Sequence, residues 1–278
     1  YTDEVVDFIK GEHDKPFFIY FAHHISHTPI EPAAAYRGKS GIKGREGIYS
    51  DFVLELDDSV GRVRSAVEEA GLAENTLIVF LSDNGPARDG SAKPLSGGKY
   101  VTMDGGHRVP GIFCWPETIP AGQVSGEMIM SMDLLPTFCH VAGVELPSDR
   151  KIDGKDISGL VTGETQDGPH EFFFYYNGLN LQAVRNAQWK LHFPRTPNDQ
   201  PYWAKNDSGK RVYTSLKEPM LFDLDKDPGE KKNVIRQHPE IVDELGRQAE
   251  HARRELGDLD TVGFDQRPHG LINPQQKE

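Results

Sequence analysis

Residues 76–85 read TLIVFLSDNG, and the interpretation of the whole chain rests on this stretch. The apolar run 76–81 predicts a buried strand. Asp83 and Asn84 follow it at once, which places a carboxylate and an amide at the carboxyl edge of a sheet, where open α/β folds keep their active sites. Such oxygen ligands suit Ca²⁺ or Mg²⁺ rather than zinc. Asp-Asn-Gly is also common turn chemistry, so a plain turn remains an alternative reading of the motif by itself.

A second apolar run covers residues 17–22 and continues into HHISHTP, residues 23–29. Between the two runs, apolar side chains recur at helical spacing: Ile48, Phe52, Leu56, Val60, Val63 and Val67. Asp51 falls on the opposite, polar face. Strand, helix and strand in this order favour a βαβ unit with parallel strands. We therefore expect His27 and Asp83 to lie at one edge of the sheet.

The remainder of this region carries further expected elements. Residues 86–108 form a polar, Gly-rich loop that contains Lys99. Residues 109–116 predict a strand, and residues 132–143 predict a helix that begins near Asp133.

The pattern changes near residue 160, where short strands are expected at 171–176, 181–184, 189–193 and 220–224. An amphipathic helix is expected at 238–257, which indicates a small α+β subdomain on an antiparallel sheet. A long loop is expected at 194–218. The predicted organisation is an α/β part over residues 1–160, the small subdomain over 161–262 and a tail over 263–278.

Composition excludes some classes of partner. The 278 residues include 31 basic and 43 acidic side chains, for a net charge of -12. We expect no nucleic-acid binding, because so acidic a chain has no basic footprint. No apolar stretch is long enough to span a membrane, so no membrane partner is expected. The two cysteines fit no disulfide framework and no zinc motif.

The first residues do not resemble the start of a gene product. The chain opens with Tyr1-Thr2-Asp3-Glu4 and enters a helical pattern at once, without Met and without a signal-like stretch. We therefore expect a fragment or a processed product, with any targeting signal upstream.

Some chemistry-bearing residues also have plainer interpretations. His27 could be a structural histidine, and Lys99 could be a solvated surface lysine. Residues 223–227 read DLDKD, like the start of an EF-hand loop, but the twelfth position is Val234 instead of the bidentate Glu. A surface turn is the better interpretation there.

Four motifs, in order, resemble type I sulfatases over residues 14–256: Phe18 to Pro29 with its His-x-Pro ending, Ser82-Asp83-Asn84-Gly85, Gly98-Lys99 followed by Gly105-Gly106-His107-Arg108-Val109-Pro110, and the segments 189–193 and 221–233. The resemblance implies an alkaline-phosphatase-like α/β fold with its sheet sandwiched by helices, and hydrolysis of sulfate esters. It implies Ca²⁺, with Mg²⁺ less suited, held by Asp83 and Asn84.

The same resemblance assigns roles to single residues. His27 would contact the sulfate and protonate the departing oxygen, and Lys99 would hold a sulfate oxygen. His107 and His192 would approach the substrate, an aryl sulfate or a sulfated sugar. Arg108 would tie the loop down. A periplasmic, secreted or lysosomal location is expected from the family.

The sequence departs from the family pattern at the nucleophile. The family uses a Cys or Ser in Cys/Ser-x-Pro-x-Arg, converted to formylglycine, and an N-terminal Asp pair as further calcium ligands. Here Cys114-Trp115-Pro116-Glu117-Thr118 has Thr118 in place of Arg and follows the lysine segment. The expected partner is therefore an N-terminal segment that carries the nucleophile, and the isolated chain is expected to be inactive.

Two other functions remain open. A phosphatase or phosphonate hydrolase of the same superfamily would need a zinc ligand where Asn84 stands, and Asn is a poor one. A non-catalytic binding or assembly fragment is the second alternative, supported by the unmatched nucleophile motif.

Overall fold

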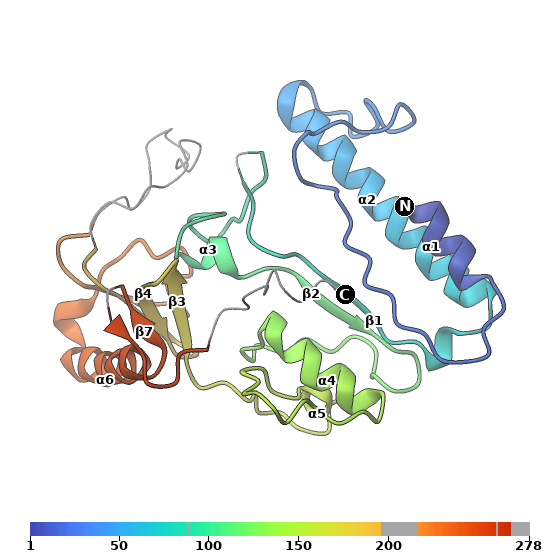
Figure 1. Ribbon diagram of the computed structural model, residues 1–278. Coiled ribbons are helices and arrows are strands. Elements are labelled where there is room, and N and C mark those ends of the chain that lie inside the picture. Colours follow the sequence, from blue (N-terminus) through green and yellow to red (C-terminus); the bar gives the residue numbers. More distant parts are fainter. Residues whose placement is uncertain (88, 196–215, 260, 268–278) are drawn as a thin grey trace, which may run out of the picture. The chain divides into compact units, whose positions relative to one another are not determined.

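The computed structural model describes residues 1–87, 89–195, 216–259 and 261–267. The chain divides into two compact units. Figure 1 shows the chain coloured by sequence position. Unit 1 comprises Tyr1–Ser82, Pro86–Ser91 and Pro110–Gln123. Unit 2 comprises Asp83–Gly85, Ala92–Val109 and the described part of Val124–Glu278. The predicted boundary at residue 160 stays a prediction.

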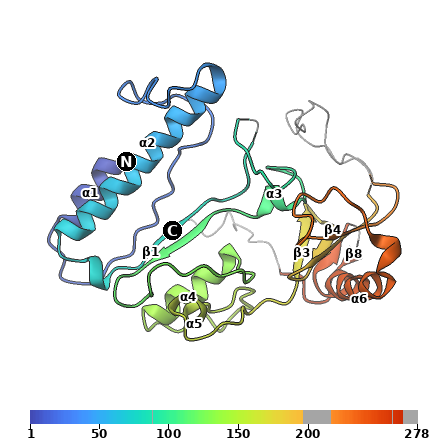
Figure 2. The same ribbon diagram turned by 180° about the vertical axis from the view of Figure 1, so that it is seen from behind.

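Two helices dominate unit 1. Helix α1 (Thr2–Ile9) lies alongside the long helix α2 (Gly44–Glu69) in both views (Figures 1 and 2), and a short 3₁₀ turn, η1 (Ala73–Asn75), follows α2. Ile9, Ala66 and Val67 are buried together between them. The helix predicted from apolar spacing is therefore confirmed.

Asp51 on α2 was predicted on the polar face but is only 4% exposed, and Ile48, predicted on the apolar face, is 47% exposed. The Asp51 carboxylate accepts the backbone N–H groups of Gly38 at 2.6 Å and Ser40 at 2.8 Å. Hydrogen bonds from Ser40, and then from Gly38, hold the pKa of Asp51 below its usual value. The carboxylate thus fixes the loop before α2 instead of facing water.

Unit 1 also contains one strand pair. Strand β1 (Ile78–Leu81) is antiparallel to β2 (Gly111–Cys114), with Ile78 opposite Cys114. Both were expected as strands. The strand predicted at residues 17–22 was wrong, because this segment joins no β-ladder among the described residues. Its side chains Phe17 and Ile19 pack against the α1–α2 core instead, so apolar character alone did not make a strand.

The first half of unit 2 is mainly helical outside its loops. Helix α3 (Asp104–His107) is one short turn, and η2 (Ser131–Asp133) leads into α4 (Leu134–Val141), with α5 (Ser158–Thr162) further on. The helix predicted at 132–143 is confirmed. Asp133 is fully buried at its start, where it accepts hydrogen bonds from two backbone N–H groups and from His170.

The C-terminal subdomain is a four-stranded antiparallel sheet in the order β3-β4-β5-β6: Phe173–Asn177, Asn180–Arg185, Trp189–His192 and Met220–Asp223. The rest comprises η3 (Ile235–Gln237), α6 (Pro239–Leu256) and the pair β7 (Gly257–Asp258) and β8 (Thr261–Val262). Helix α6 covers β4 and β5, which Figure 2 shows from behind, and buries Leu245 and Ala249. The predicted antiparallel sheet and helix are confirmed.

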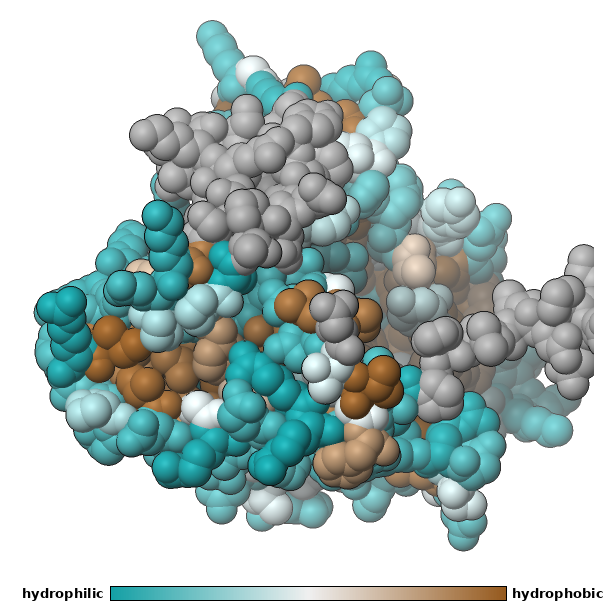
Figure 3. All heavy atoms as spheres, turned by 60° about the vertical axis from the view of Figure 1, so that its left-hand side comes forward, coloured by the Kyte–Doolittle hydropathy of each residue, from teal (hydrophilic) through white to brown (hydrophobic). Residues whose placement is uncertain are grey.

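Parts of two predicted segments, the loop 194–218 and the tail 263–278, fall outside the described residues. The face seen in Figure 3 is largely hydrophilic with smaller apolar patches. Among the described residues, no helix has the length and apolarity needed to cross a bilayer.

Candidate active site

The Asp83-Asn84-Gly85 turn directly follows β1 and is joined to α3 through its backbone. The Gly85 N–H donates to the Gly106 carbonyl at 3.0 Å. A Cβ on Gly85 would lie 1.8 Å from the Gly105 carbonyl oxygen, so only glycine fits there. Asn84 Nδ2 donates to Asp83 Oδ2 at 2.6 Å, which holds the two candidate metal ligands together.

The segment 96–104, here called the lysine loop, carries Lys99. Its two ends meet, because the Gly105 N–H donates to the Ser96 carbonyl at 2.9 Å. Cβ atoms on Gly105 and Gly106 would lie within 2.4 Å of loop carbonyl oxygens. Lys99 is half-buried, and its Nζ lies 5.4 Å from the Tyr100 ring centroid. The loop therefore presents a partly exposed cation on a tightly packed backbone.

Asp104 begins α3 with its carboxylate buried at 2% exposure. Oδ1 accepts from Lys190 Nζ at 2.8 Å and from the Tyr175 hydroxyl at 2.7 Å, and Oδ2 accepts from Arg185 Nη1 at 2.6 Å. Burial alone would raise the pKa of Asp104, but the charges of Lys190 and Arg185 outweigh it and lower the pKa to about 2. Asp104 is thus an anion held by two cations.

Glu230 is the second buried anion, at 1% exposure. Its Oε1 accepts the Asp104 N–H at 2.7 Å and lies 3.3 Å from Lys190 Nζ. Its Oε2 accepts from His192 Nε2 at 2.6 Å. Burial opposes ionisation, yet Lys190 and the bond from His192 bring the pKa of Glu230 below its usual value. We call Asp104, Lys190 and Glu230, with Arg185, Tyr175 and His192, the buried cluster.

The remaining members of the buried cluster include its cations, a neutral hydroxyl and a neutral histidine. Lys190 is fully buried, and its Nζ also lies 3.8 Å from the Tyr175 ring centroid. Burial and the neighbouring Asp104 raise the pKa of Tyr175 well above its usual value, so its hydroxyl stays a donor. Burial lowers the pKa of His192 to about 4, so the ring is neutral near pH 7. Two cations therefore face two anions.

The predicted substrate histidines differ in exposure. His107 is exposed at the end of α3, with its ring edge-on to Tyr175 at 4.9 Å between centroids. Partial desolvation, followed by the charge of Lys190, lowers its pKa. His192 is 2% exposed and donates to Glu230. The structure therefore places His192 inside the subdomain and His107 at its surface.

His27 belongs to unit 1, whereas the other predicted site residues belong to unit 2. It is exposed, and its Nδ1 donates to the Thr28 carbonyl at 2.9 Å. That bond fixes Nδ1 as the protonated nitrogen and leaves Nε2 to exchange a proton with a ligand. The expected meeting of His27 with Asp83 stays a prediction.

The Asp83–Asn84 pair offers hard oxygen donors, which fit Ca²⁺ or Mg²⁺ by chemistry. The part of the chain that the structure describes has no group of three or more His, Cys, Asp or Glu able to hold a metal. Because Ca²⁺ takes six to eight oxygens, these two residues would be only part of a calcium site.

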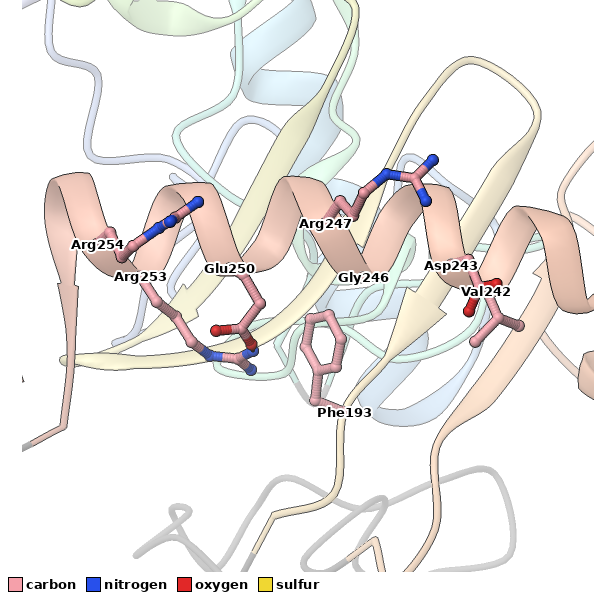
Figure 4. A pocket seen from close by; sticks show the side chains of 8 residues that line it. All are labelled: Phe193, Val242, Asp243, Gly246, Arg247, Glu250, Arg253 and Arg254. Carbon is pink, nitrogen blue, oxygen red and sulfur yellow. The ribbon is translucent and has the colours of Figure 1, made fainter.

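A shallow groove runs along α6 (Figure 4). Phe193 forms its floor, and most of its lining is charged: Asp243, Arg247, Glu250, Arg253 and Arg254. The Arg253 guanidinium lies 4.6 Å from the Phe193 ring centroid. None of the predicted site residues lines this groove.

Comparison with known proteins identifies the family. Residues 1–144 match the model of the family described as "Sulfatase", and residues 168–267 match "C-terminal region of aryl-sulfatase". The chain belongs to the sulfatase family. This confirms the resemblance found in the sequence.

Individual sulfatases agree with this assignment. The chain is 37% identical to an arylsulfatase of Hemicentrotus pulcherrimus, over 83% of this chain and 44% of the relative. It is also 37% identical to N-acetylgalactosamine-6-sulfatase of Mus musculus, over 89% of this chain and 50% of the relative. It thus spans about half the length of these curated relatives.

Solved structures extend the likeness to the fold. PsFucS1 sulfatase from Pseudoalteromonas sp. superposes with a TM-score of 0.76 at 28% identity, covering 90% of this chain and 51% of that one. A sulfatase structure from work on glycosaminoglycan metabolism in Bacteroides thetaiotaomicron gives a TM-score of 0.77 at 29% identity, covering 91% and 53%. The expected alkaline-phosphatase-like fold class is confirmed.

Sequence reasoning named one member of the buried cluster, His192, and missed the others. The notable signal was a lysine in the short apolar strand Trp189-Lys190-Leu191-His192, which must find an anion if the strand is buried. Glu230 gave a weaker signal, at the end of a turn.

Proposed function

We propose that this protein is part of a sulfatase that hydrolyses sulfate esters with the help of a divalent cation. The observation that carries the proposal is the bond from the Gly85 N–H to the Gly106 carbonyl, at 3.0 Å in a chain of the sulfatase family. It joins the turn with two oxygen ligands to α3, which directly follows the loop with Lys99. A cation site and a lysine on one backbone frame suit an anionic ester.

Asp83 and Asn84 are the residues that would hold the cation. Their oxygen donors favour Ca²⁺ over zinc, which also favours a sulfatase over a two-zinc phosphatase. When bound, the cation would neutralise negative charge on the sulfate group. The remaining ligands are not assigned to residues of this chain.

Lys99 and His27 would act on the ester itself. Lys99 would bind a sulfate oxygen as a compact positive charge. His27, as an imidazolium with Nδ1 donating to Thr28, would deliver its Nε2 proton to the departing alcohol oxygen and become a neutral ring. In the overall reaction the S–O bond to the alcohol breaks, water supplies the new oxygen on sulfur, and the products are the alcohol and sulfate.

The nucleophile is not assigned in this sequence. Cys114 lies at the end of β2, paired in register with Ile78, and its motif has Thr118 where the family pattern has Arg. We therefore give Cys114 a packing role. The formylglycine that the family resemblance implies is not assigned to any of these 278 residues.

The proposed substrate is a sulfated sugar, an aryl sulfate or a steryl sulfate. Curated relatives carry the names N-acetylgalactosamine-6-sulfatase, arylsulfatase and steryl-sulfatase. His107, exposed beside the lysine loop, would contact this substrate. We give His192 a positioning role instead, because its ring is buried against Glu230.

Hydrolysis of a chromogenic aryl sulfate by the full-length protein tests the proposal, with the matching aryl phosphate as comparison. We expect Lys99→Ala to lower kcat/KM by about 10²-fold or more, as loss of a preorganised charge does. Lys232→Ala, an exposed lysine in the same unit, is the control and should retain activity. Preferential hydrolysis of the phosphate, or a Lys99→Ala variant with the kcat/KM of the wild type, would contradict the proposal.

A further inference from the structure

We infer that the buried cluster, through Glu230, is the device that positions Lys99 and the Asp83–Asn84 turn for the reaction. This inference rests on the proposed function, because it takes Lys99 as the residue that binds the sulfate group. It makes Glu230, Asp104 and Lys190 positioning residues, since none of them is exposed enough to touch a substrate.

Two consecutive residues hold both ends of the lysine loop. At its start, the Ser96 hydroxyl donates to the Gly229 carbonyl at 2.5 Å. At its end, the Asp104 N–H donates to Glu230 Oε1 at 2.7 Å. Lys99 lies between these two attachments. The position of the Gly229–Glu230 turn therefore restrains the backbone that carries the Lys99 side chain.

The backbone conformation of Glu230 indicates that the position of the Gly229–Glu230 turn is held by specific interactions. Its φ of +52° is in the left-handed region, which is unfavourable for a residue with a side chain. That conformation persists because the carboxylate is held by the Asp104 N–H, His192 and Lys190.

The burial of three charges also favours positioning over stability. Lys190 and Glu230 are at most 1% exposed and Asp104 is 2% exposed. Replacing such buried ion pairs by apolar side chains is often neutral or stabilising, so stability alone does not explain them. The charges instead fix orientation, because each carboxylate oxygen of Asp104 and Glu230 accepts a hydrogen bond from a specific donor.

The same attachment reaches the candidate metal ligands. Asp104 begins α3, whose Gly106 carbonyl accepts the Gly85 N–H at 3.0 Å. The adjacent glycines leave no room for a shift, because a Cβ on Gly85 would meet the Gly105 carbonyl at 1.8 Å. Asp104 therefore connects the C-terminal sheet with both the cation turn and the lysine loop. Both views place α3 beside β3 and β4 (Figures 1 and 2).

The test is a double-mutant cycle between Glu230→Gln and Lys99→Ala in the full-length protein, with an aryl sulfate as substrate. Glu230→Gln keeps the shape and one acceptor oxygen but removes the charge. We expect it to lower kcat/KM by about 10–100-fold in the wild-type background, as a small misplacement of a charged group does. In the Lys99→Ala background it should lower kcat/KM by a clearly smaller factor, because the part of its effect that passes through Lys99 is already lost.

Asp133→Asn is the matched control, because it also disturbs a fully buried carboxylate of unit 2, the one that pairs with His170. Its effect on kcat/KM, measured well below the melting temperature, should be the same in both backgrounds. Hydrogen exchange supplies a readout independent of activity: the amides of the lysine loop should lose protection in Glu230→Gln and keep it in Asp133→Asn.

Ser96→Ala gives a milder variant if Glu230→Gln fails to fold, because it removes only the hydroxyl bond to Gly229. It should lower kcat in the wild-type background and have little further effect beside Lys99→Ala. Additive losses of activity, or unchanged exchange of the loop, would overturn the inference. A Lys99→Ala variant with unchanged kcat/KM would instead refute the role of Lys99 in the proposed function, so the two failures are distinguishable.

Discussion

Lys190 Nζ and Asp104 Oδ1 lie 2.8 Å apart, although 86 positions separate the two residues in the chain. Lys190 lies on strand β5 of the C-terminal sheet, and Asp104 begins the short helix α3 at the end of the lysine loop. The contact shows that the C-terminal sheet and the loop share one buried electrostatic core. The predictions below test what that core and the candidate cation turn contribute.

Removing the lysine should destabilise the fold strongly. Lys190→Met leaves Asp104 and Glu230 buried with one cation fewer, and breaking a buried ion pair in this way costs about 3–5 kcal/mol. Urea unfolding measures the free energy. Lys232→Met, at an exposed position of the same unit, should change it by less than about 0.5 kcal/mol. Equal stabilities of the two variants would contradict the prediction.

Acidification should weaken the protein through His192. Its pKa is about 4 in the folded state against an ordinary 6.5. As the pH falls from 6.5 to 4, the unfolded chain takes up a proton that the folded chain does not, so the free energy of unfolding falls. We expect His192→Gln to flatten this part of the stability profile, measured by urea unfolding between pH 7 and 5. His251→Gln, exposed on α6, should leave the slope unchanged.

At lower pH the stability should depend on Asp104, one of the two anions of the buried cluster. The pKa of Asp104 is about 2, below its ordinary 3.8, so its stabilisation is full above pH 3.8 and is lost as the pH falls toward 2. Asp104→Asn should remove the corresponding decrease in the free energy of unfolding between pH 3.8 and 2, measured by urea unfolding. A decrease that persists in the variant would show that other carboxylates cause it.

Two glycines should respond in opposite directions to alanine. A Cβ on Gly105 would lie 2.3 Å from the Ser96 carbonyl, whereas a Cβ on Gly246, within α6, meets nothing within 4 Å. Gly105→Ala should cost about 1–3 kcal/mol through overpacking. Gly246→Ala should gain about 0.5–1 kcal/mol through helix propensity. Thermal unfolding of both variants checks the pair, and a gain for Gly105→Ala would contradict the close packing.

Calcium should stabilise the full-length protein through Asp83. At a free concentration of about 100 times its Kd, a ligand that binds only the folded state adds about 2.7 kcal/mol. We expect Ca²⁺ to raise Tm, EGTA to reverse the rise, and Asp83→Ala to abolish it. Asp225→Ala, in the turn that resembles an EF-hand, should respond like the wild type. An undiminished Ca²⁺ effect in Asp83→Ala would exclude Asp83 as a ligand.

Periodic patterns were sufficient for most of the elements. The spacing of Phe52 and Val67 predicted α2, and the alternation of short apolar runs predicted the strands of the C-terminal sheet. These predictions succeeded because a helix or strand must bury a face with its own period. The same reasoning was wrong for residues 17–22, because a strand also needs a neighbouring strand to pair with, and no local pattern specifies that neighbour.

The candidate site was predictable only where its residues are adjacent in the chain. Asp83 and Asn84 stand together after a strand, so their chemistry was visible at once. His192 was assigned to the substrate because its motif resembles the family's, but its ring is buried against Glu230. Sequence showed which side chains can carry chemistry, and not which of them reach the surface.

The sequence by itself determined the secondary structure of most segments, the family, and the hard-oxygen character of the Asp83–Asn84 turn, because each depends on neighbouring residues or on short motifs. Only the tertiary structure decided that Asp104, Lys190 and Glu230 meet. Their charges are stable out of water only when partners from distant segments face them, and chain folding, not local spacing, sets that geometry.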